Sequence, residues 1–518
     1  MGETLEQPGV GCRADGIPLL LADAWSERGP DAPGAVILGI DQGTTGTTCL
    51  VLDERAGVAG RAYREHRQHF PRPGWVEHEP EEIWESVQAT AHAALADAGL
   101  DPRALQAIGI TNQRETALAW DRDSGEPLAR AVVWQDRRTA ERCDELREQG
   151  HEQLLRERTG LVLDAYFSAT KWEWLLTEGG VEPERAALGT IDAWLVHKLC
   201  ARHATDHSNA SRTLLFDIHE RRFDPDLCEL LSIPLEALPE PLPSAHVVGE
   251  TEVLGGGRGV PVAGVAGDQQ AALFGQGCHA AGQGKNTYGT GSFVLQNTGP
   301  EPPPLVHGLL STLAWTVDEE RTDYAVEASI FVTGAAVQWL RDGLGIIAEA
   351  AESEGLARSL DSNDGVYFVP ALTGLASPHW DPYARGTIVG LTRGNHRAHL
   401  ARAALEAIAY QTVDAVRAME EASGEVLDEL RADGAAVENA WLMQFQADVL
   451  GVPVRVPEVV ETTALGAAAL AGVAVGTWTE EDVRALWREA ACYEPSMSGD
   501  ERETLVAGWH AALERARG

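Results

Sequence analysis

Lysine is almost absent from this sequence: Lys171, Lys198 and Lys285 are the only ones among 518 residues. Asp and Glu number 79 against 41 Lys and Arg, which gives a formal net charge of −38 at pH 7. So acidic a chain has no basic patch with which to displace the counterions of nucleic acid or of an anionic membrane. We therefore expect neither of them as a partner.

Long apolar runs and paired cysteines are also missing. No apolar stretch approaches the roughly 20 residues that span a bilayer, and the early run 17–22 is interrupted by Pro18 and has no basic flank. The seven cysteines are widely spread and form no C-x-x-C pair, so neither a disulfide framework nor a zinc site follows. These absences predict a cytoplasmic chain without membrane insertion.

The surplus of carboxylates is typical of a halophilic surface. In a salty cytosol, self-repulsion is screened because the Debye length falls to about 3 Å near 1 M salt. A GC-rich genome is the alternative explanation. It accounts for arginine in place of lysine but not for the excess of Asp and Glu.

The length of the chain predicts at least two large domains. Residues 1–34 carry Gly, Pro and Asp without a strong period and are interpreted as a loosely ordered extension. From Ala35 on, strand-like runs alternate with helical ones such as 81–98, which favours an α/β fold. The strand-like runs are 35–40, 104–110, 117–121 and 131–134, and the proline-rich stretches 239–243 and 299–304 are predicted to be connecting loops.

The stretch GIDQGTTG, residues 39–46, places a lone carboxylate, Asp41, between a buried strand and a turn. Gly43 and Gly46 let the backbone approach an anion closely, and Thr44 and Thr45 add hydroxyl donors. Such a turn is suited to holding a phosphate. The alternative is an ordinary hairpin turn.

A second strand-turn-helix pattern occurs at PVAGVAGDQQAALFGQ, residues 261–276. It places Asp268 at the end of a strand and at the start of a helix, where free N–H groups face a ligand. A helix N-cap is the alternative role for this aspartate. Taken together, Asp41 and Asp268 suit a metal–phosphate complex and a proton transfer, respectively.

One short stretch is echoed in the second half of the chain. GTTGTTCLVLD (43–53) and GTGSFVLQNTG (289–299) both place a Gly/Thr turn before an apolar strand. The echo suggests a duplicated core that closes over a cleft, although chance similarity is the alternative.

No Walker A motif and no protein-kinase motif set is present, so any phosphoryl transfer would belong to another fold class.

An ordered set of motifs resembles the glycerol kinases of the FGGY carbohydrate-kinase family. Each motif alone is modest evidence, but their order and number are specific, and the resemblance runs from about Val36 to near the C-terminus. The motifs are GIDQGTTGTT (39–48), PRPGWVEHEPEEIW (71–84), GITNQRET (109–116), VVWQDRR (132–138), YFSATKWEWLLTE (166–178), GDQQAALFGQ (267–276), KNTYGTGSF (285–293) and GLASPHWDPYARGTIVGLTRG (374–394).

The resemblance implies a two-domain, actin-like (ribonuclease H-like) α/β fold with an interdomain cleft. It implies an N-terminal domain over residues 35–276 with the polyol site, and a C-terminal domain over 277–518 with the nucleotide site. The implied reaction transfers the γ-phosphoryl group of ATP to glycerol, giving sn-glycerol 3-phosphate and ADP. Such kinases are often homodimers or homotetramers.

The resemblance also implies the site residues. Glycerol would be bound by Arg114, Glu115, Trp134, Tyr166, Asp268, Gln269 and Phe293. Asp268 would be the general base, and Asp41 would bind Mg²⁺ through water or position the γ-phosphate. The nucleotide would be held by Thr44, Thr45, Gly46, Thr290, Gly334, Gln338, Gly434, Ala435 and Asn439.

The chemistry of the implied polyol site is coherent. A triol offers donors and acceptors that Arg114, Glu115 and Asp268 can satisfy, while the rings of Trp134 and Phe293 cover its carbons. A site that pairs several hydroxyls rejects analogues that lack one, because its own polar groups would be left unpaired. Structural roles remain the alternative for Gly334, as a helix contact, and for Asn439, as a helix cap.

The sequence departs from the family pattern in two places. The family usually shows D-G-G-A near the adenine, whereas this chain has Ala435 after Gly434, so we expect a weakened or shifted nucleotide site. The loop 254–260 is shorter than the one that binds fructose 1,6-bisphosphate in some relatives, which argues against such regulation, although Arg258 remains within it.

Two other functions stay open at this point. A kinase for another polyol or ketose would need more room than Trp134 and Phe293 leave. An actin-like nucleotide switch would use Asp41 and the Thr turns but would not require the polyol-type residues.

Overall fold

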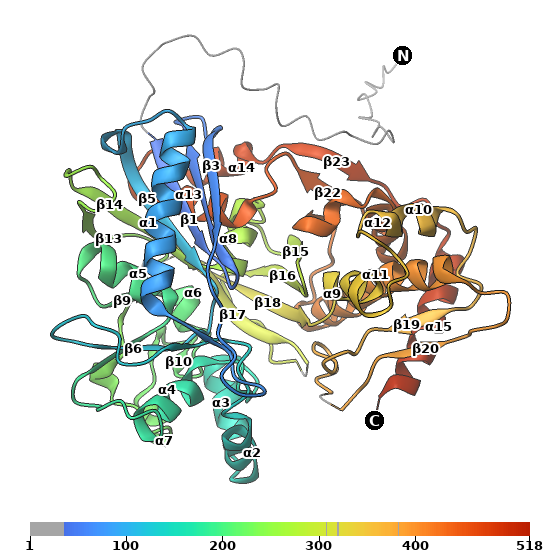
Figure 1. Cartoon of the computed structure of the whole chain (residues 1–518), viewed down its shortest axis with the longest axis horizontal. Coiled ribbons are helices and arrows are strands. Elements are labelled where there is room, and N and C mark those ends of the chain that lie inside the picture. Colours follow the sequence, from blue (N-terminus) through green and yellow to red (C-terminus); the bar gives the residue numbers. More distant parts are fainter. Residues whose placement is uncertain (1–35, 307, 319–320, 382, 518) are drawn as a thin grey trace, which may run out of the picture.

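Two large mixed β-sheets form the framework of this computed structural model (Figure 1). The structure describes residues 36–306, 308–318, 321–381 and 383–517. The predicted extension of residues 1–34 lies outside the described residues.

The first sheet has six strands in the order β13-β14-β5-β1-β2-β3. β1, β2 and β3 form an antiparallel meander, and β5 and β14 then continue the sheet in parallel with β1. The strands are β1 (Val36–Gln42), β2 (Gly46–Leu52), β3 (Val58–Glu65), β5 (Leu105–Asn112), β13 (Ala245–Thr251) and β14 (Val260–Gly267).

The second sheet repeats this pattern. Its antiparallel strands β15, β16 and β18 are followed, on the other side of β15, by the parallel strands β21 and β22. The strands are β15 (Gly284–Tyr288), β16 (Ser292–Gly299), β17 (Leu310–Thr316), β18 (Thr322–Ile330), β21 (Leu430–Asp433), β22 (Val454–Pro457) and β23 (Glu489–Tyr493). The turns 43–45 and 289–291 join equivalent strands of the two sheets, so the internal echo reflects a duplicated topology.

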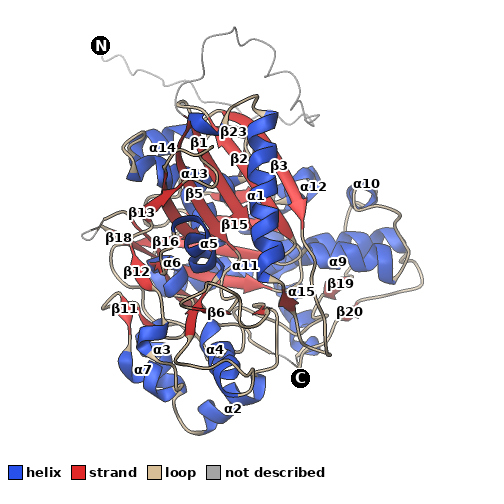
Figure 2. Cartoon of the chain, turned by 60° about the vertical axis from the view of Figure 1, so that its left-hand side comes forward, coloured by secondary structure: helices blue, strands red, loops and turns tan. Residues whose placement is uncertain are grey.

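Helices cover both faces of the first sheet (Figure 2). Alternate residues of β1 face opposite ways, so Leu38 and Ile40 pack with α1 (Pro80–Asp97) and α5 (Ile191–Cys200), whereas Ile37 packs with α8 (Asp268–Gly275) and α13 (Thr462–Ala474). On the second sheet, α11 (Arg397–Ser423) and α12 (Ala440–Leu450) share one core with the strands, and α8 contacts β15 and β16. The short helix α8 therefore touches both sheets.

A row of glycines brings α13 unusually close to the first sheet. Gly39, Gly109 and Gly264 lie side by side on β1, β5 and β14. A Cβ at Gly109 would lie 2.0 Å from the carbonyl oxygen of Ala467, and one at Gly39 would lie 2.2 Å from that of Ala464. α13, although it lies late in the chain, is thereby fixed to the sheet formed by the first half of the sequence.

The rest of the first half forms a smaller, mostly helical unit, whose core also includes Leu310, Leu313 and Tyr324 of β17 and β18. It contains β4 (Glu77–His78), β6 (Leu118–Asp121), β7 (Ala131–Val132), β8 (Ala186–Gly189), β9 (Ala204–Asp206), β10 (Phe216–Asp217), β11 (Arg222–Phe223), β12 (Glu240–Leu242), α2 (Ala140–Glu148), α3 (Glu152–Thr159), α4 (Ser168–Thr177), α6 (His207–Ala210) and α7 (Pro225–Leu230). The predicted loop 239–243 is partly wrong, because β12 pairs in parallel with β9. Pro241 is tolerated because this sheet has only two strands and both are edges.

The second half adds α9 (Gly334–Gln338), α10 (Glu352–Arg358), β19 (Tyr367–Val369), β20 (Thr387–Val389), α14 (Glu480–Leu486) and α15 (Gly499–Ala516) around its sheet. The predicted loop 299–304 is irregular from residue 300 on, whereas Gly299 still belongs to β16. None of the helices in the described residues is both long enough and apolar enough to cross a membrane. The cysteines in the described part of the chain form no disulfide.

The glycine row generates a stability prediction. Gly109→Ala should lower the free energy of unfolding by about 3 kcal/mol or more, because the new methyl meets backbone atoms of α13 that have no freedom to move aside. Gly355→Ala is the matched control. Gly355 lies inside α10 with no atom within 4 Å of a Cβ, and this change should stabilise by about 0.5–1 kcal/mol. Urea unfolding measures both, and equal stability of the two variants would contradict the packing role.

Candidate active site

The β1–β2 turn is a hairpin turn, closed by a hydrogen bond of 2.9 Å from the Gly43 N–H to the Gly46 carbonyl. Asp41 is half-buried in β1 just before it, and Thr44 and Thr45 lie at its tip, the latter exposed. A Cβ at Gly46 would lie 2.6 Å from the carbonyl oxygen of Arg64, so this glycine is required for packing against β3. The hairpin and the predicted phosphate turn are therefore the same feature.

Trp134 connects this turn to the predicted polyol residues. Its indole Nε1 donates a hydrogen bond of 2.9 Å to Thr44 Oγ1. The ring lies edge-to-face against Tyr166 with centroids 5.5 Å apart, and against Phe293 at 6.4 Å. The aromatic residues predicted to cover the substrate's carbons are thus brought together from three separate parts of the chain.

Arg114 and Glu115 follow β5 in a tight, strained turn. The Thr116 N–H donates to the Arg114 carbonyl at 2.8 Å, and Glu115 between them has φ of 61°, in the left-handed region. A three-residue turn of this kind is rare and costs energy, and such strain is typical of functional sites. Both side chains are buried.

A buried group of charges surrounds Arg114. Its guanidinium forms a two-pronged ion pair with Glu327 of β18, at 2.6 and 3.1 Å, and its Nε lies 3.1 Å from Asp268 Oδ1. Arg212 donates to Glu115 Oε1 at 2.7 Å and to Glu327 Oε1 at 3.0 Å. The two arginines hold the pKa of Glu327 down at about 2 despite its burial.

Glu327 and Arg212 were not predicted from the sequence. Glu327 is a lone carboxylate within the apolar strand YAVEASI, which is the only sequence signal that marks it. Arg212 follows the short helix α6 in a segment without any recognised motif.

Asp268 is the first residue of α8, but it is not a helix cap. The N-cap position is Gly267, and no side chain caps the helix. The Asp268 side chain is about 25% exposed, and its Oδ1 accepts a hydrogen bond of 2.7 Å from the Gln269 N–H. Burial raises the pKa of Asp268, against the opposing charges of Arg114 and Lys285.

The charge of Asp268 acts on Asp41. Burial and then the negative charge of Asp268 raise the pKa of Asp41 to about 8. A carboxylate whose ionisation is opposed by a second carboxylate lies in a negative field that attracts a cation. The two aspartates predicted to share one site are therefore electrostatically coupled.

Two of the three lysines are buried beside the predicted substrate residues. Lys285 donates to Gln269 Oε1 at 2.5 Å and to Thr287 Oγ1 at 2.8 Å, and burial lowers its pKa to about 8. Lys171 of α4 donates to the carbonyls of residues 165–167, which include that of Tyr166 at 2.6 Å, and burial lowers its pKa to about 7. Each lysine therefore fixes the position of a predicted glycerol contact.

Thr290 and Gly334 lie together in the second half of the molecule. The Thr290 carbonyl accepts hydrogen bonds from the N–H groups of Thr333 at 2.9 Å and Ala335 at 3.0 Å. A Cβ at Gly334 would lie 2.7 Å from the Gly289 carbonyl oxygen, so the glycine allows α9 to start against this turn. Gln338, at the end of α9, is exposed.

Gly434, Ala435 and Asn439 lie between β21 and α12. Gly434 has φ of 87°, and a Cβ there would lie 2.3 Å from the Tyr288 carbonyl oxygen. Ala435 is exposed and is not among the residues with positive φ, so its departure from glycine requires no altered backbone angle. Asn439 caps α12, its Oδ1 accepting from the Leu442 N–H at 2.9 Å.

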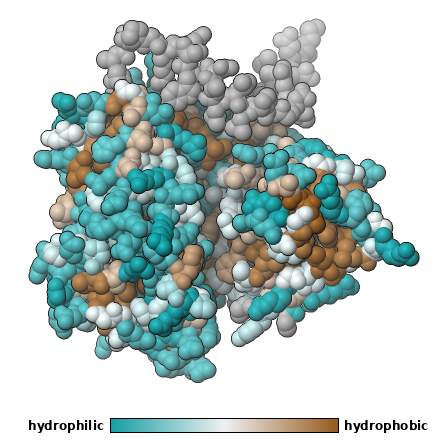
Figure 3. All heavy atoms as spheres, in the orientation of Figure 1, coloured by the Kyte–Doolittle hydropathy of each residue, from teal (hydrophilic) through white to brown (hydrophobic). Residues whose placement is uncertain are grey.

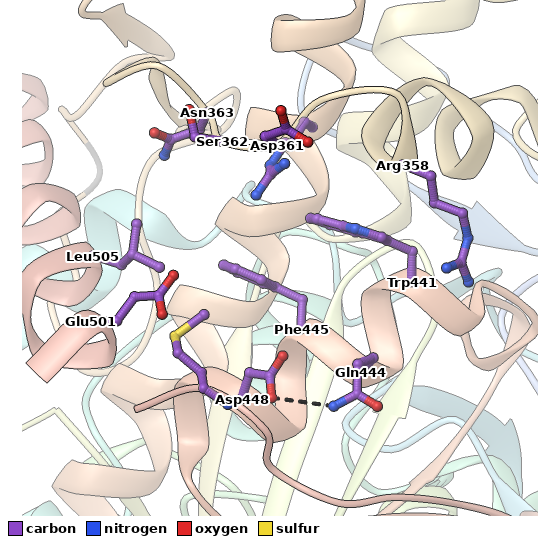
Figure 4. A pocket seen from close by; sticks show the side chains of 12 residues that line it. Arg358, Asp361, Ser362, Asn363, Trp441, Gln444, Phe445, Asp448, Glu501 and Leu505 are labelled. Atoms are coloured by element: carbon purple, nitrogen blue, oxygen red, sulfur yellow. Dashed lines mark hydrogen bonds between the residues drawn. The ribbon is translucent and has the colours of Figure 1, made fainter. Parts of the chain in front are cut away.

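A cavity of about 220 Å³ lies elsewhere, between α10, α11, α12 and the start of α15 (Figure 4). None of the predicted site residues lines it. Trp441 and Phe445, which stack on each other at its wall, belong to α12, and Asp448 there accepts a hydrogen bond from Gln444.

In the loop 254–260, Arg258 donates to the Leu105 carbonyl and is thus already engaged within the protein.

Side chains from both sheets thus meet at one place, and a groove separates the two halves on the face shown in Figure 3. Within the part of the chain that the structure describes, no group of three or more His, Cys, Asp or Glu side chains is arranged to hold a metal ion. A divalent cation at Asp41 would accordingly need ligands from a bound nucleotide.

Comparison with known proteins agrees with this geometry. Residues 36–275 match the N-terminal domain of the FGGY family of carbohydrate kinases, and residues 284–475 match its C-terminal domain. A glycerol kinase of Dechloromonas aromatica is 54% identical over 494 residues, which cover 94% of this chain and 98% of that protein. Glycerol kinase 2 of Thermotoga maritima is 53% identical over 490 residues, or 93% and 99% of the two chains.

Solved structures have the same fold. The crystal structure of Plasmodium falciparum glycerol kinase with ADP superimposes with a TM-score of 0.88 at 34% identity, covering 93% of this chain and 98% of that one. A gluconate kinase from Lactobacillus acidophilus shares the fold alone, with a TM-score of 0.84 at 20% identity over 93% and 97% of the two chains. The chain therefore belongs to the FGGY family of carbohydrate kinases.

Proposed function

We propose that this protein is an ATP-dependent glycerol kinase, which transfers the γ-phosphoryl group of ATP to glycerol and gives sn-glycerol 3-phosphate and ADP. The observation that carries the proposal is the convergence of Arg114, Glu115 and Asp268 with the rings of Trp134 and Phe293 at one site. Two relatives that are 54% and 53% identical to this chain are glycerol kinases. We also propose that it acts in the cytoplasm, as a homodimer or homotetramer.

The polar and aromatic groups suit a small triol. Arg114 is fixed by ion pairs and donates, while Glu115 and Asp268 offer carboxylate oxygens that accept. The edge-to-face packing of Trp134 with Tyr166 and Phe293 forms an apolar wall beside them. Gln269 is held by Lys285 and completes the proposed set.

Asp268 is the proposed proton acceptor. As the glycerol hydroxyl oxygen forms its bond to the γ-phosphorus, the bond from that phosphorus to the bridging oxygen of ADP breaks, and the hydroxyl proton passes to Asp268. The loose transition state of phosphoryl transfer needs this proton to leave only late, so orienting the hydroxyl is a large part of the role. The raised pKa makes the carboxylate a better base.

The nucleotide is proposed to lie between the two equivalent turns. Thr44, Thr45 and Gly46 would face the phosphates from the first half and Thr290 from the second, with Gly334, Gln338, Gly434, Ala435 and Asn439 around the nucleoside. Asp41 would hold Mg²⁺ through water, and the raised pKa of Asp41 beside Asp268 fits a position for a cation. The ion, when bound, neutralises charge on the phosphate oxygens.

A substrate panel tests the proposed function. With ATP and Mg²⁺, three- to five-carbon polyols and ketoses are compared by ADP release, at several salt concentrations because the chain is so acidic. Glycerol should give a kcat/KM at least about tenfold above the other substrates, since each unpaired polar group in the site costs about 1–3 kcal/mol. Preference for a five-carbon sugar, or a rate of ADP release that does not depend on any polyol, would refute the assignment.

Asp268→Asn tests the proposed base. Asparagine keeps an oxygen for Arg114 Nε and the Gln269 N–H but accepts no proton, so kcat should fall by about 10²-fold or more while glycerol affinity changes little. Steady-state kinetics and glycerol titration calorimetry give the two values. Asp268→Ala is the companion variant and should weaken glycerol binding as well. Turnover that survives Asp268→Asn would exclude a catalytic role.

Ala435→Gly tests the departure from the family pattern. Because Ala435 has an ordinary backbone angle and is exposed, only its methyl group distinguishes it from the usual glycine. Removing this methyl should lower the KM for ATP roughly two- to tenfold, a gain below about 1.4 kcal/mol, and leave the KM for glycerol unchanged. A KM for ATP that stays constant or rises would show that the methyl does not crowd the nucleotide.

A further inference from the structure

The proposed glycerol site lies at the carboxyl ends of β5 and β14 in the first sheet, yet its Arg114 is paired with a carboxylate of the second sheet. Arg114 follows β5, whereas the carboxylate that binds both of its terminal nitrogens, Glu327, belongs to β18. Both side chains are fully buried, with at most 2% of their surface exposed. The ion pair therefore joins the two halves of the molecule beneath the site.

The face of the second sheet that carries Glu327 also carries Phe293, a proposed substrate contact. In the antiparallel pairing of β16 with β18, Phe293 lies opposite Ser329 and Leu295 lies opposite Glu327. Paired residues point to one face, and so do residues two apart in a strand, so Phe293 and Glu327 share a face. Ser329 completes this group by donating to Glu327 Oε1 at 3.4 Å.

The contacts of Arg114 are divided between its carboxylate partners in a definite way. Glu327 accepts from Nη1 and Nη2, and Nη1 also donates to Gln270 Oε1 at 3.2 Å. The Nε atom lies 3.1 Å from one oxygen of Asp268 and 3.7 Å from Glu115 Oε1. Lys285 also acts on Asp268 and Glu327, and Arg212 also acts on Glu327. Because Glu327 binds both terminal nitrogens of the guanidinium, Arg114 is not free to form a two-pronged pair with Asp268. The second oxygen of Asp268 therefore stays available to the substrate.

We propose that Glu327 is a positioning residue for the glycerol site: it fixes Arg114 from the opposite sheet and so keeps Asp268 free to accept the substrate hydroxyl. This inference rests on the proposed glycerol kinase function. Without the Glu327 charge, Arg114 turns toward the remaining carboxylates, Asp268 and Glu115, and occupies the oxygens that the triol needs. The polyol site is thus complete only when both sheets are in place.

Glu327→Gln is the direct test. The glutamine has the same size but presents an NH₂ group and no charge to two guanidinium groups. We expect the KM for glycerol to rise about tenfold or more and kcat to fall, while the KM for ATP stays within about twofold. A merely structural role would not separate the two substrates in this way. A glycerol KM within twofold of the parent value would overturn the proposal.

Two further variants keep the test decisive. Glu406→Gln makes the same change at another buried carboxylate of the second half, which pairs with Arg402 of α11 at 2.7 Å, and should leave the glycerol KM unchanged. Glu327→Asp keeps the charge and should give an intermediate glycerol KM. If Glu327→Gln fails to fold, as judged by circular dichroism, Glu327→Asp decides, and a parental glycerol KM in that variant refutes the proposal.

The parent protein separates the two claims. If it phosphorylates glycerol but the Glu327 variants bind glycerol as it does, only the positioning role fails. If the parent protein shows no turnover of glycerol with ATP, the proposed function fails first.

Discussion

The ion pair between Arg114 and Glu327 is the contact on which the candidate site depends. Taking two charges out of water is costly, and the cost is repaid only where the geometry is good and the remaining atoms find partners. Here Arg212, Ser329 and Asp268 provide those partners. Such a pair requires the end of β5 and the middle of β18 to be held at a fixed distance.

Close backbone packing provides that fixed distance. The glycine row of the first sheet seats α13, and α13 in turn meets α8, where a Cβ at Gly466 would lie within 2 Å of the Ala271 carbonyl oxygen. Because α8 also touches the second sheet, Asp268 at its start is placed between the two halves. Small residues, rather than large apolar ones, therefore determine where the proposed catalytic group lies.

Local patterns predicted the local structure well. The strands at 35–40 and 104–110, the helix at 81–98 and the strand-turn-helix around Asp268 all form close to their predicted bounds. The motif resemblance identified the family, which the comparisons confirm. The domain bounds at 35–276 and 277–518 and the individual roles of the site residues stay predictions.

Local sequence patterns did not identify interaction partners that lie far apart in the chain. Glu327 lies 213 residues after Arg114, and nothing in the spacing of either residue specifies the other. The roles of Lys171 and Lys285 were missed in the same way, since a buried lysine looks in sequence like any surface charge. The strand at 240–242 was missed because two prolines flank it and a third lies within it, although an edge strand tolerates them.

A crystal structure of the protein with glycerol and ADP tests the central claim most directly. The account predicts one glycerol molecule within hydrogen-bonding distance of Arg114, Glu115 and Asp268, with the guanidinium of Arg114 still paired to Glu327 and ADP between the turns at 43–45 and 289–291. Glycerol bound away from Arg114, or an Arg114 released from Glu327 in that complex, would contradict it.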